Sequence, residues 1–156
     1  MKIREATSND CKSISELYWE SDNFHNINQP NIYSATEKPF RSEEFIKEQI
    51  EDKNSMFYII EVEGDVIGFI YGYVESKGSL PIHKQRNYFY IDNIVVNKKF
   101  QAKGYGRMLL DKVISECKEK KYSDIMLNVY SFNNNAISLY DNIGFKEVAK
   151  DMILQL

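Results

Sequence analysis

The sequence predicts an α/β protein of the mixed α+β kind: a mostly antiparallel sheet, one central parallel β–α–β crossover, and helices on both faces. Apolar runs over 56–62 and 66–75, joined by a turn at 63–65, indicate a hairpin, which makes that part of the sheet antiparallel. Strand-like segments over 88–96 and 124–130 flank a helical pattern, which makes them a right-handed parallel pair. Helical patterns before the hairpin and after each of these strands then cover the sheet.

The N-terminal third carries weaker periodicity than the rest. Ile14, Leu17 and Tyr18 follow at helical spacing after capping side chains at 7–10, whereas residues 20–40 lack a clear period. The elements expected before the hairpin are a strand over 2–6, a helix from about 11, a long loop over 20–40 with at most one short helix, and a helix over 43–52 capped by Ser42. A loop this long in a compact domain is often functional.

The second half shows clearer patterns. The strand over 88–96 is apolar, β-branched or aromatic except at Asp92-Asn93, which is typical of a central strand. Gly144 predicts the end of the last helix as a C-cap. The remaining elements expected are a polar loop over 76–86, a helix over 104–120, a short helix over 135–142 capped by the Asn residues at 133–135, and a final strand over 145–153.

Length, charge and cysteine content exclude several classes of protein. The 156 residues predict a single domain, 1–156, and the net charge of −3 argues against a nucleic-acid partner. Two cysteines make no disulfide framework, and no Cys/His spacing suggests a metal site. The chain has no apolar run of about 18 residues and no N-terminal signal region, so we expect no membrane span and a reducing, cytoplasmic location.

The strongest local pattern lies between the central strand and the helix over 104–120. Glycines at a helix N-terminus let backbone N–H groups approach an anion closely, and basic side chains add positive charge beside it. The segment is Gln101-Ala102-Lys103-Gly104-Tyr105-Gly106-Arg107. It therefore predicts a phosphate or pyrophosphate site at the C-terminal edge of the strand.

Other readings of this loop are weaker. It lacks the Gly-Lys-Ser/Thr of a Walker loop, and a dinucleotide fingerprint would need glycine where Leu109 stands. Asp124 lies about where a ribose-binding acid would be, but one parallel crossover is too little for a doubly wound domain. A glycine turn that only starts a helix stays an alternative.

A second motif lies one strand later. Its residues are Asn133-x-x-Ala136-x-x-Leu139-Tyr140-x-x-x-Gly144-Phe145, and on their own they describe a capped amphipathic helix with a core tyrosine. Together with Gln101-x-x-Gly104-x-Gly106 they resemble the GNAT superfamily of N-acetyltransferases. The match is strongest over 88–148, and the order of strands matches over nearly the whole chain.

The resemblance implies a fold, a cosubstrate and its binding residues. The cosubstrate is acetyl-CoA, without a metal, and the arm of the cofactor enters where the strands over 88–96 and 124–130 separate. The loop over 101–107 would bind the pyrophosphate, with Gln101 at a position often held by Arg, so that binding rests more on Lys103. The other cofactor-binding residues implied are Ile94, Val95, Val96, Asn133 and Ala136.

The resemblance also implies direct transfer to a primary amine of a small molecule or peptide. Tyr140 would donate to the departing thiolate, a transfer that is uphill unless the site lowers the pKa of the phenol. A backbone N–H of Val95 or Val96 would stabilise the oxyanion. Asp92, on the same strand face as Tyr90 and Ile94, would be the general base, because burial would raise its pKa into a useful range.

Several alternatives stay open. Asp92 could be a solvent-facing sheet residue, Glu75 is a second candidate base, and His25 is expected to be a surface residue. Cys117 at helical spacing predicts a core thiol rather than an acyl-enzyme nucleophile. The aromatic side chains expected either to wall an acceptor pocket or to pack in the core are Tyr18, Trp19, Phe24, Tyr33 and Phe40.

The alternative functions are a non-catalytic acyl-CoA-binding module and a structural or nucleotide-binding α/β protein. Homodimers are common in the family, and the sequence identifies no interface. It does not identify the acceptor either, although the acidic balance of charge favours a cationic one.

Overall fold

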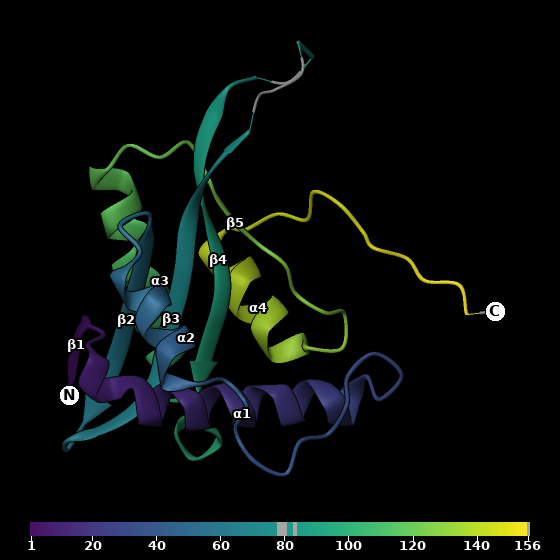
Figure 1. Cartoon of the computed structure of the whole chain (residues 1–156). Coiled ribbons are helices and arrows are strands. Elements are labelled where there is room, and N and C mark those ends of the chain that lie inside the picture. Colours follow the sequence, from purple (N-terminus) through teal and green to yellow (C-terminus); the bar gives the residue numbers. More distant parts are fainter. Residues whose placement is uncertain (78–80, 83, 156) are drawn as a thin grey trace.

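A five-stranded mixed sheet forms the centre of the molecule (Figure 1). The computed structural model describes residues 1–77, 81–82 and 84–155. The strands, in the spatial order of their numbers, are β1 (Lys2–Glu5), β2 (Ser55–Val62), β3 (Asp65–Lys77), β4 (Arg86–Val96) and β5 (Ile125–Leu127). All neighbours are antiparallel except β4 and β5, which are parallel. The predicted fold class is confirmed.

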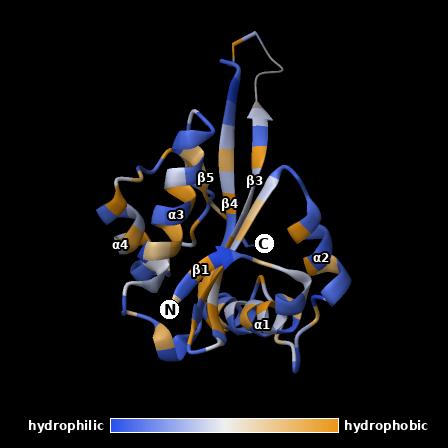
Figure 2. Cartoon of the chain, turned by 90° about the vertical axis from the view of Figure 1, so that its left-hand side faces the viewer, coloured by the Kyte–Doolittle hydropathy of each residue, from blue (hydrophilic) through white to orange (hydrophobic). Residues whose placement is uncertain are grey.

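Helices cover both faces of this sheet, as Figure 2 shows in a view turned by 90°. On one face lie α1 (Cys11–Asn28) and α2 (Glu43–Glu51), and on the other α3 (Tyr105–Glu119) and α4 (Asn134–Ile143). Single 3-10 turns occupy Ser8–Asp10 and Lys98–Phe100. The sheet separates two apolar cores: one gathers around Ile14, Phe57 and Phe69 against α1 and α2, the other around Ile70, Phe89 and Leu109 against α3.

The first helix is longer than the sequence predicts. α1 continues through Asn28, so the prediction of a loop over 20–40 is wrong in its first half. Only residues up to Tyr18 on this helix are buried, and the half that follows therefore shows no apolar period. The helix ends just before Pro30, which cannot continue it. The Ser42 cap of α2 is confirmed, since Phe45 N donates to Ser42 Oγ at 3.2 Å.

The C-terminal edge of the sheet also differs from the prediction. The final strand expected over 145–153 is absent from the described residues, and β5 is shorter than the expected 124–130. A segment with strand propensity forms a strand only where another strand can pair with it, and in the described part of the chain β5 has a neighbouring strand on one side only. Of the loop expected over 76–86, residues 78–80 and 83 lie outside the described part, while Ser76 and Arg86 belong to strands.

An ion cluster ties β1 to the start of α1. Arg4 donates to both oxygens of Asp10, at 2.8 and 2.9 Å, and to Glu61 Oε2 at 3.0 Å. The N–H and hydroxyl of Thr7 also donate to the Asp10 carboxylate, which is 5% exposed. The Arg4 guanidinium, followed by these Thr7 bonds, lowers the pKa of Asp10 against the opposing effect of its burial.

We expect Asp10→Asn to destabilise the fold by about 2 kcal/mol at pH 7, since the charge-assisted bonds are lost in a buried place. Because the pKa of Asp10 is lowered on folding, its stabilisation is present above the unfolded value and is lost as the pH falls through the folded value. Thermal melts should therefore separate the variant from the wild type at pH 7 and bring them together in acid. Glu61→Gln, at a more exposed member of the cluster, should cost less. Equal melting temperatures at pH 7 would contradict this role.

Candidate active site

Strand β4 carries a bulge at Asp92. In its register with β3, Asn93 pairs with Tyr71 and Ile91 pairs with Gly72, so that Asp92 stands opposite no residue. A bulge of this kind inserts one extra residue, bends the strand and reverses the alternation of side chains beyond it. It lies at the only two polar positions of the otherwise apolar predicted strand.

The bulge changes which side chains share a face. Before it, Ile91 packs in the core beneath α3, and after it Ile94 packs against that same core, while Val95 belongs to the core beneath α1. Asp92 interacts electrostatically with Tyr18 and Tyr71, which lie in the core beneath α1. Asp92 and Ile94 therefore lie on opposite faces, and the prediction that they share one is wrong, because a strict two-residue period does not allow for the extra residue.

Beyond the bulge, no strand among the described residues pairs with one edge of β4. Pairing with β5 ends at Ile91 opposite Leu127, whereas β4 runs on to Val96. Asn97 N donates to Ile67 O toward β3, so the alternation of the strand directs the Val95 amide toward β3 and the Val96 amide toward the open edge. Of the two amides predicted as oxyanion donors, this geometry favours Val96. The separation of the two strands that the family resemblance implies is present.

The loop over 101–107 follows directly from this open edge. The Gln101 side-chain amide donates to Val96 O at 2.9 Å and so ties the loop to the strand. Gly104 has φ +84° and Ala102 φ +59°, and the first backbone bond of α3 runs from Met108 N to Gly104 O at 3.1 Å. Among the described residues, no backbone acceptor receives the N–H groups at 105–107. These amides begin a helix of fifteen residues, and its dipole adds positive charge there.

The two basic side chains of the loop differ in their neighbours: Arg107 lies beside a carboxylate and Lys103 beside an aromatic ring. Arg107 Nε lies 3.2 Å from Asp111 Oδ1, one helical turn later, and both side chains are about half exposed. Lys103 Nζ lies 5.2 Å from the centroid of the Phe100 ring. Because Asp111 offsets the charge of Arg107, Lys103 is the more available of the two for an anion at this loop.

Helix α4 packs beside the start of α3. A Cβ on Gly106 would meet Leu139 Cδ2 at 3.4 Å, an ordinary van der Waals distance, so the two helices lie in contact at this point. Asn133 Oδ1 caps α4 by accepting from Ala136 N at 3.3 Å. The predicted residues Asn133, Ala136 and Tyr140 are thus carried to the same side of the sheet as the loop over 101–107.

Tyr140 is a buried phenol within this arrangement. Its ring is 7% exposed and meets the Phe145 ring at a centroid distance of 5.6 Å. Burial raises the pKa of Tyr140 to about 12. Easy proton transfer to a thiolate would need a lowered pKa, whereas burial raises it. The phenol therefore keeps its proton at physiological pH.

Asp92 is solvent-exposed and lies beside a polar and aromatic surface on the other side of the sheet, so the alternative of a solvent-facing sheet residue stays open. Desolvation raises the pKa of its carboxyl, against a hydrogen bond from Asn93 Nδ2 at 2.5 Å and the charge of Arg41. Arg41 in turn lies over the Tyr18 ring, 4.3 Å from its centroid, and pairs with Asp22. A raised pKa with a stated cause is typical of a functional carboxylate.

Aromatic side chains extend this surface along β3 and β4. Tyr73 meets Tyr71 at a ring-centroid distance of 6.3 Å and Tyr90 at 5.7 Å. Sequence reasoning did not select Arg41, Tyr73 or Tyr90 as site residues. The signal for the tyrosines was available, since aromatic residues alternate at 69, 71 and 73 on β3 and occupy 88–90 on β4. Nothing in the sequence marks Arg41, because its position is set by the loop that leads into α2.

The other candidate base, Glu75, is already engaged. Its carboxylate accepts from the hydroxyl of Tyr88, which is 1% exposed. The two residues are cross-strand partners on β3 and β4. The Glu75 carboxylate provides the hydrogen-bond acceptor that the buried Tyr88 hydroxyl needs. This structural role explains why Glu75 lies where it does.

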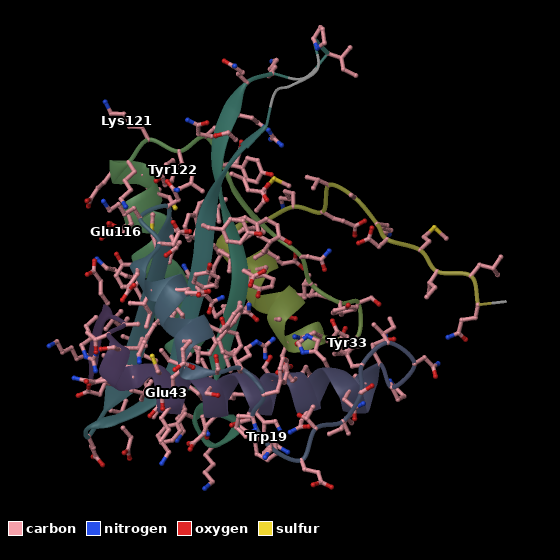
Figure 3. All side chains as sticks on the ribbon, in the orientation of Figure 1. Trp19, Tyr33, Glu43, Glu116, Lys121 and Tyr122 are labelled. Carbon is pink, nitrogen blue, oxygen red and sulfur yellow. The ribbon has the colours of Figure 1, made fainter. Side chains whose placement is uncertain are left out.

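A separate aromatic cluster joins the end of α1 to the segment entering α4. The hydroxyls of Tyr33 and Tyr130 lie 2.7 Å apart, and His25 meets both rings at centroid distances of 5.4 and 5.6 Å. Figure 3 shows Tyr33 at this place. Phe24 and Phe132 complete the cluster. His25 is half-buried among these rings, which makes it more enclosed than the sequence predicts for a surface histidine.

The remaining predicted aromatics divide between core and surface. Tyr18 is 1% exposed and packs on Phe69, whereas Phe40 is 63% exposed. The indole N–H of Trp19 donates to Thr36 O at 2.9 Å and fixes the loop before α2. These contacts favour packing for Tyr18 and anchoring for Trp19.

Cys117 is a core residue, as predicted. It is 3% exposed, and burial raises the pKa of its thiol to about 11, which disfavours the thiolate that a nucleophile needs. Within the described residues, no group of three or more His, Cys, Asp or Glu could hold a metal ion. None of the helices in that part of the chain is long and apolar enough to cross a membrane.

Comparisons with known proteins agree with this geometry. The Acetyltransferase (GNAT) family matches residues 6–145. Streptothricin acetyltransferase A of Bacillus subtilis is 32% identical over 126 residues, which cover 79% of this chain and 70% of the relative. An N-alpha-acetyltransferase of Sulfurisphaera tokodaii is 29% identical over 109 residues, 67% of this chain, and the match spans only 64% of that relative's length.

A solved structure extends the agreement to the fold as a whole. A mutant form of the BH1408 protein from Bacillus halodurans has a TM-score of 0.95 and 25% sequence identity, with 100% of this chain and 99% of the other covered. The bulged strand with its open edge, the helix N-terminus beyond it and the match over most of the chain lead to one conclusion: this chain belongs to the GNAT family of acetyltransferases.

Proposed function

We propose that this protein is an N-acetyltransferase that moves the acetyl group of acetyl-CoA directly to a primary amine of a small molecule or peptide. One observation carries the proposal. The open edge of β4 runs from the bulge at Asp92 to the loop over 101–107, with Asp92 on one face of the strand and Tyr140 on the other. A thioester at this edge would have a base on the side of the amine and a donor on the side of the sulfur.

The residues along this edge suit the parts of acetyl-CoA. Amides at 105–107 and the Lys103 ammonium suit a pyrophosphate. The free edge of β4 at Ile94 and Val96 offers backbone groups to the amides of the pantetheine arm, as an added strand would. Asn133 and Ala136 begin the helix that closes the other side, and the side-chain N–H groups of Asn133 remain available while its oxygen caps α4.

The chemistry needs three contributions from the chain. Asp92 takes a proton from the ammonium of the acceptor, directly or through a water, because only the free amine is a nucleophile. The Val96 amide donates to the oxygen on which negative charge develops. Tyr140 donates a hydrogen bond to the sulfur as it departs.

The acceptor is expected to meet the tyrosine-rich surface beside Asp92. Phenol rings and a carboxylate attract a cationic amine. One relative is named an N-alpha-acetyltransferase and another a streptothricin acetyltransferase, so both kinds of amine belong in the test.

The structure also supports two other predictions. Both apolar cores pack on one sheet, which supports a single domain, and two buried free thiols suit the reducing cytoplasm.

Thiol release measures the proposed reaction. The protein is incubated with acetyl-CoA and each member of an amine panel that holds polyamines, amino acids, aminoglycosides and peptide N-termini, and free CoA is followed over time. Turnover with a primary amine and none with its N-acetylated form supports the proposal. Tight binding of acetyl-CoA without turnover on any amine would instead favour the non-catalytic acyl-CoA-binding module.

We expect Gly104→Ala to weaken acetyl-CoA binding by about tenfold, because a residue with a Cβ is strained at φ +84° and the loop amides turn away from their anion. Thermal shift with acetyl-CoA, and with NAD and ATP as comparison ligands, measures the change. Ala102→Gly is the matched control: it relieves a positive φ in the same loop and should leave binding as tight as in the wild type. Equal loss in both variants would contradict the proposed geometry.

A further inference from the structure

Glu20 lies on the half of α1 that follows the last buried residue of the helix, Tyr18, so apolar packing does not account for its place. The helix crosses the end of β4 there (Figure 1). Asn97 Nδ2 donates to Glu20 Oε2 at 2.9 Å, and Lys98 N donates to Glu20 Oε1. The two oxygens of one carboxylate thus join α1 to the residues that directly follow β4.

Asn97 is the residue on which the turn after β4 is built. Its N–H donates to Ile67 O on β3 at 2.8 Å, and its C=O accepts from Phe100 N at 2.8 Å. Its side-chain oxygen accepts from Lys99 N at 3.1 Å, which leaves the side-chain nitrogen for Glu20. All the polar groups of Asn97 are therefore engaged, and the turn is held from two sides, by the sheet and by α1.

This turn lies between two parts of the proposed reaction site. Val96, whose amide is the proposed oxyanion donor, directly precedes Asn97, and the loop over 101–107 directly follows Phe100. The Gln101 side chain donates back to Val96 O at 2.9 Å, which closes the turn onto the strand. A shift of Asn97 would therefore move the Val96 amide and the loop together, and small errors of position are costly in a reaction site.

We propose that Glu20 is a positioning residue for acetyl transfer: it acts through Asn97 and Lys98 to hold the Val96 amide and the loop over 101–107 in place. The inference rests on the proposed function, which assigns these groups to acetyl-CoA. A carboxylate in contact with the turn before this loop repels phosphates bound there, so its charge and its position have opposite effects. Removal of the charge alone would tighten binding of the cofactor, whereas loss of the position weakens it.

Glu20→Gln tests the position, because an amide offers one acceptor oxygen to the donors of Asn97 and Lys98 and turns a further donor toward them. We expect this variant to raise the Kd of acetyl-CoA by about tenfold and to lower the single-turnover rate at saturating substrates by about tenfold. The amine is the one found by the thiol-release screen. Glu16→Gln is the matched control, since Glu16 is exposed one turn earlier on the same helix and loses the same charge. It should leave both values as in the wild type.

The double variant, Glu20→Gln with Asn97→Asp, exchanges the polar groups of the contact and restores its hydrogen bonds. The new amide nitrogen donates to the new carboxylate, whose second oxygen accepts from Lys99 N, and the amide oxygen accepts from Lys98 N. Its net charge equals that of the wild type. We expect the Kd and the rate to return to within about twofold of the wild-type values. Asn97→Asp alone sets two carboxylates against each other and should weaken binding at least as much as Glu20→Gln.

Hydrogen exchange at the Lys98 and Lys99 amides, measured without ligand, reports the contact itself. Their protection should fall in Glu20→Gln and return in the double variant. A wild type that binds acetyl-CoA no more tightly than Glu20→Gln would overturn the role of Glu20 and leave the proposed function intact. So would a double variant that recovers amide protection without recovering the Kd. A wild type that binds no acetyl-CoA would overturn the proposed function, and this inference with it.

Discussion

Asp92→Asn lowers kcat/KM for the acceptor amine by about 1000-fold, because the amine then has no positioned group to take its proton. The substitution keeps the size of the side chain and one acceptor oxygen, and it replaces the basic carboxylate with a neutral amide. Initial rates at saturating acetyl-CoA, with the amine identified by the thiol-release screen, provide the measurement. The Kd for acetyl-CoA should not change, since Asp92 lies on the face of β4 away from α3 and α4.

The pH dependence gives the same prediction a second readout. Desolvation raises the pKa of Asp92, so the wild-type kcat/KM should rise with pH through that raised value, and the Asn variant should lack this limb. The second rise, near pH 10, belongs to the amine and should remain in both. Asn93 and Arg41 act on the pKa of Asp92, and the Asp92 charge in turn raises the pKa of Tyr18, Tyr71 and Tyr73, which lie near it.

Asp92→Asn should lower activity but raise the stability of the fold at neutral and higher pH. Because the folded protein raises the pKa of Asp92, proton binding stabilises the fold below the unfolded value, and this stabilisation is lost as the pH rises through the folded value. Asp92→Asn should therefore melt at a higher temperature than the wild type at pH 8 but not in acid. A variant with lower activity and lower stability would indicate a structural part instead.

Glu75→Gln distinguishes the two candidate bases. Glu75 accepts from the buried Tyr88 hydroxyl, so its loss should lower stability while the pH limb assigned to Asp92 remains. Loss of the limb in Glu75→Gln, and its retention in Asp92→Asn, would transfer the role of base to Glu75.

The order of strands and helices could be predicted from the sequence because both periodicities are strong where a core is buried. The helix over 104–120 has its apolar residues Leu109, Leu110 and Val113 fully buried, and the structure moves its ends by one residue. The hairpin turn was marked by Glu63 and Gly64, which both adopt positive φ. Prediction failed where structure depends on something outside the segment itself, as in the outer half of α1 and the segment over 145–153.

In the candidate site, too, local features could be predicted from the sequence, whereas features set by strand pairing could not. Glycines and caps such as Gly104 and Asn133 are local features, and their places were predictable. The bulge at Asp92 was not, because the polar pair Asp92-Asn93 does not by itself show that the strand holds one extra residue. Arg41 and Tyr73 could not be placed beside Asp92 without the pairing of β3 with β4 and the path of the loop before α2.

Tyr140→Phe lowers kcat by about 100-fold and leaves the Kd of acetyl-CoA within a factor of two, since the loss is confined to a hydrogen bond that strengthens as the sulfur departs. The ring stays in place, because its packing against Phe145 does not involve the hydroxyl. Single-turnover rates measure the chemical step, and equilibrium binding of acetyl-CoA is measured in parallel. Tyr58→Phe is the matched control, since Tyr58 is 6% exposed, burial raises its pKa to about 12 as well, and it lies on β2.

A pKa of about 12 also limits what Tyr140 would contribute to the proposed reaction. A thiol titrates near 8.5, so complete proton transfer from this phenol to the thiolate is uphill by about 3.5 units, and the stabilisation is that of a hydrogen bond. It follows that kcat should show no loss of activity from ionisation of Tyr140 below pH 10. A Tyr140→Phe enzyme with wild-type turnover would leave the hydroxyl without a part in catalysis, whereas slowing in both Tyr140→Phe and Tyr58→Phe would mean that general loss of packing is responsible.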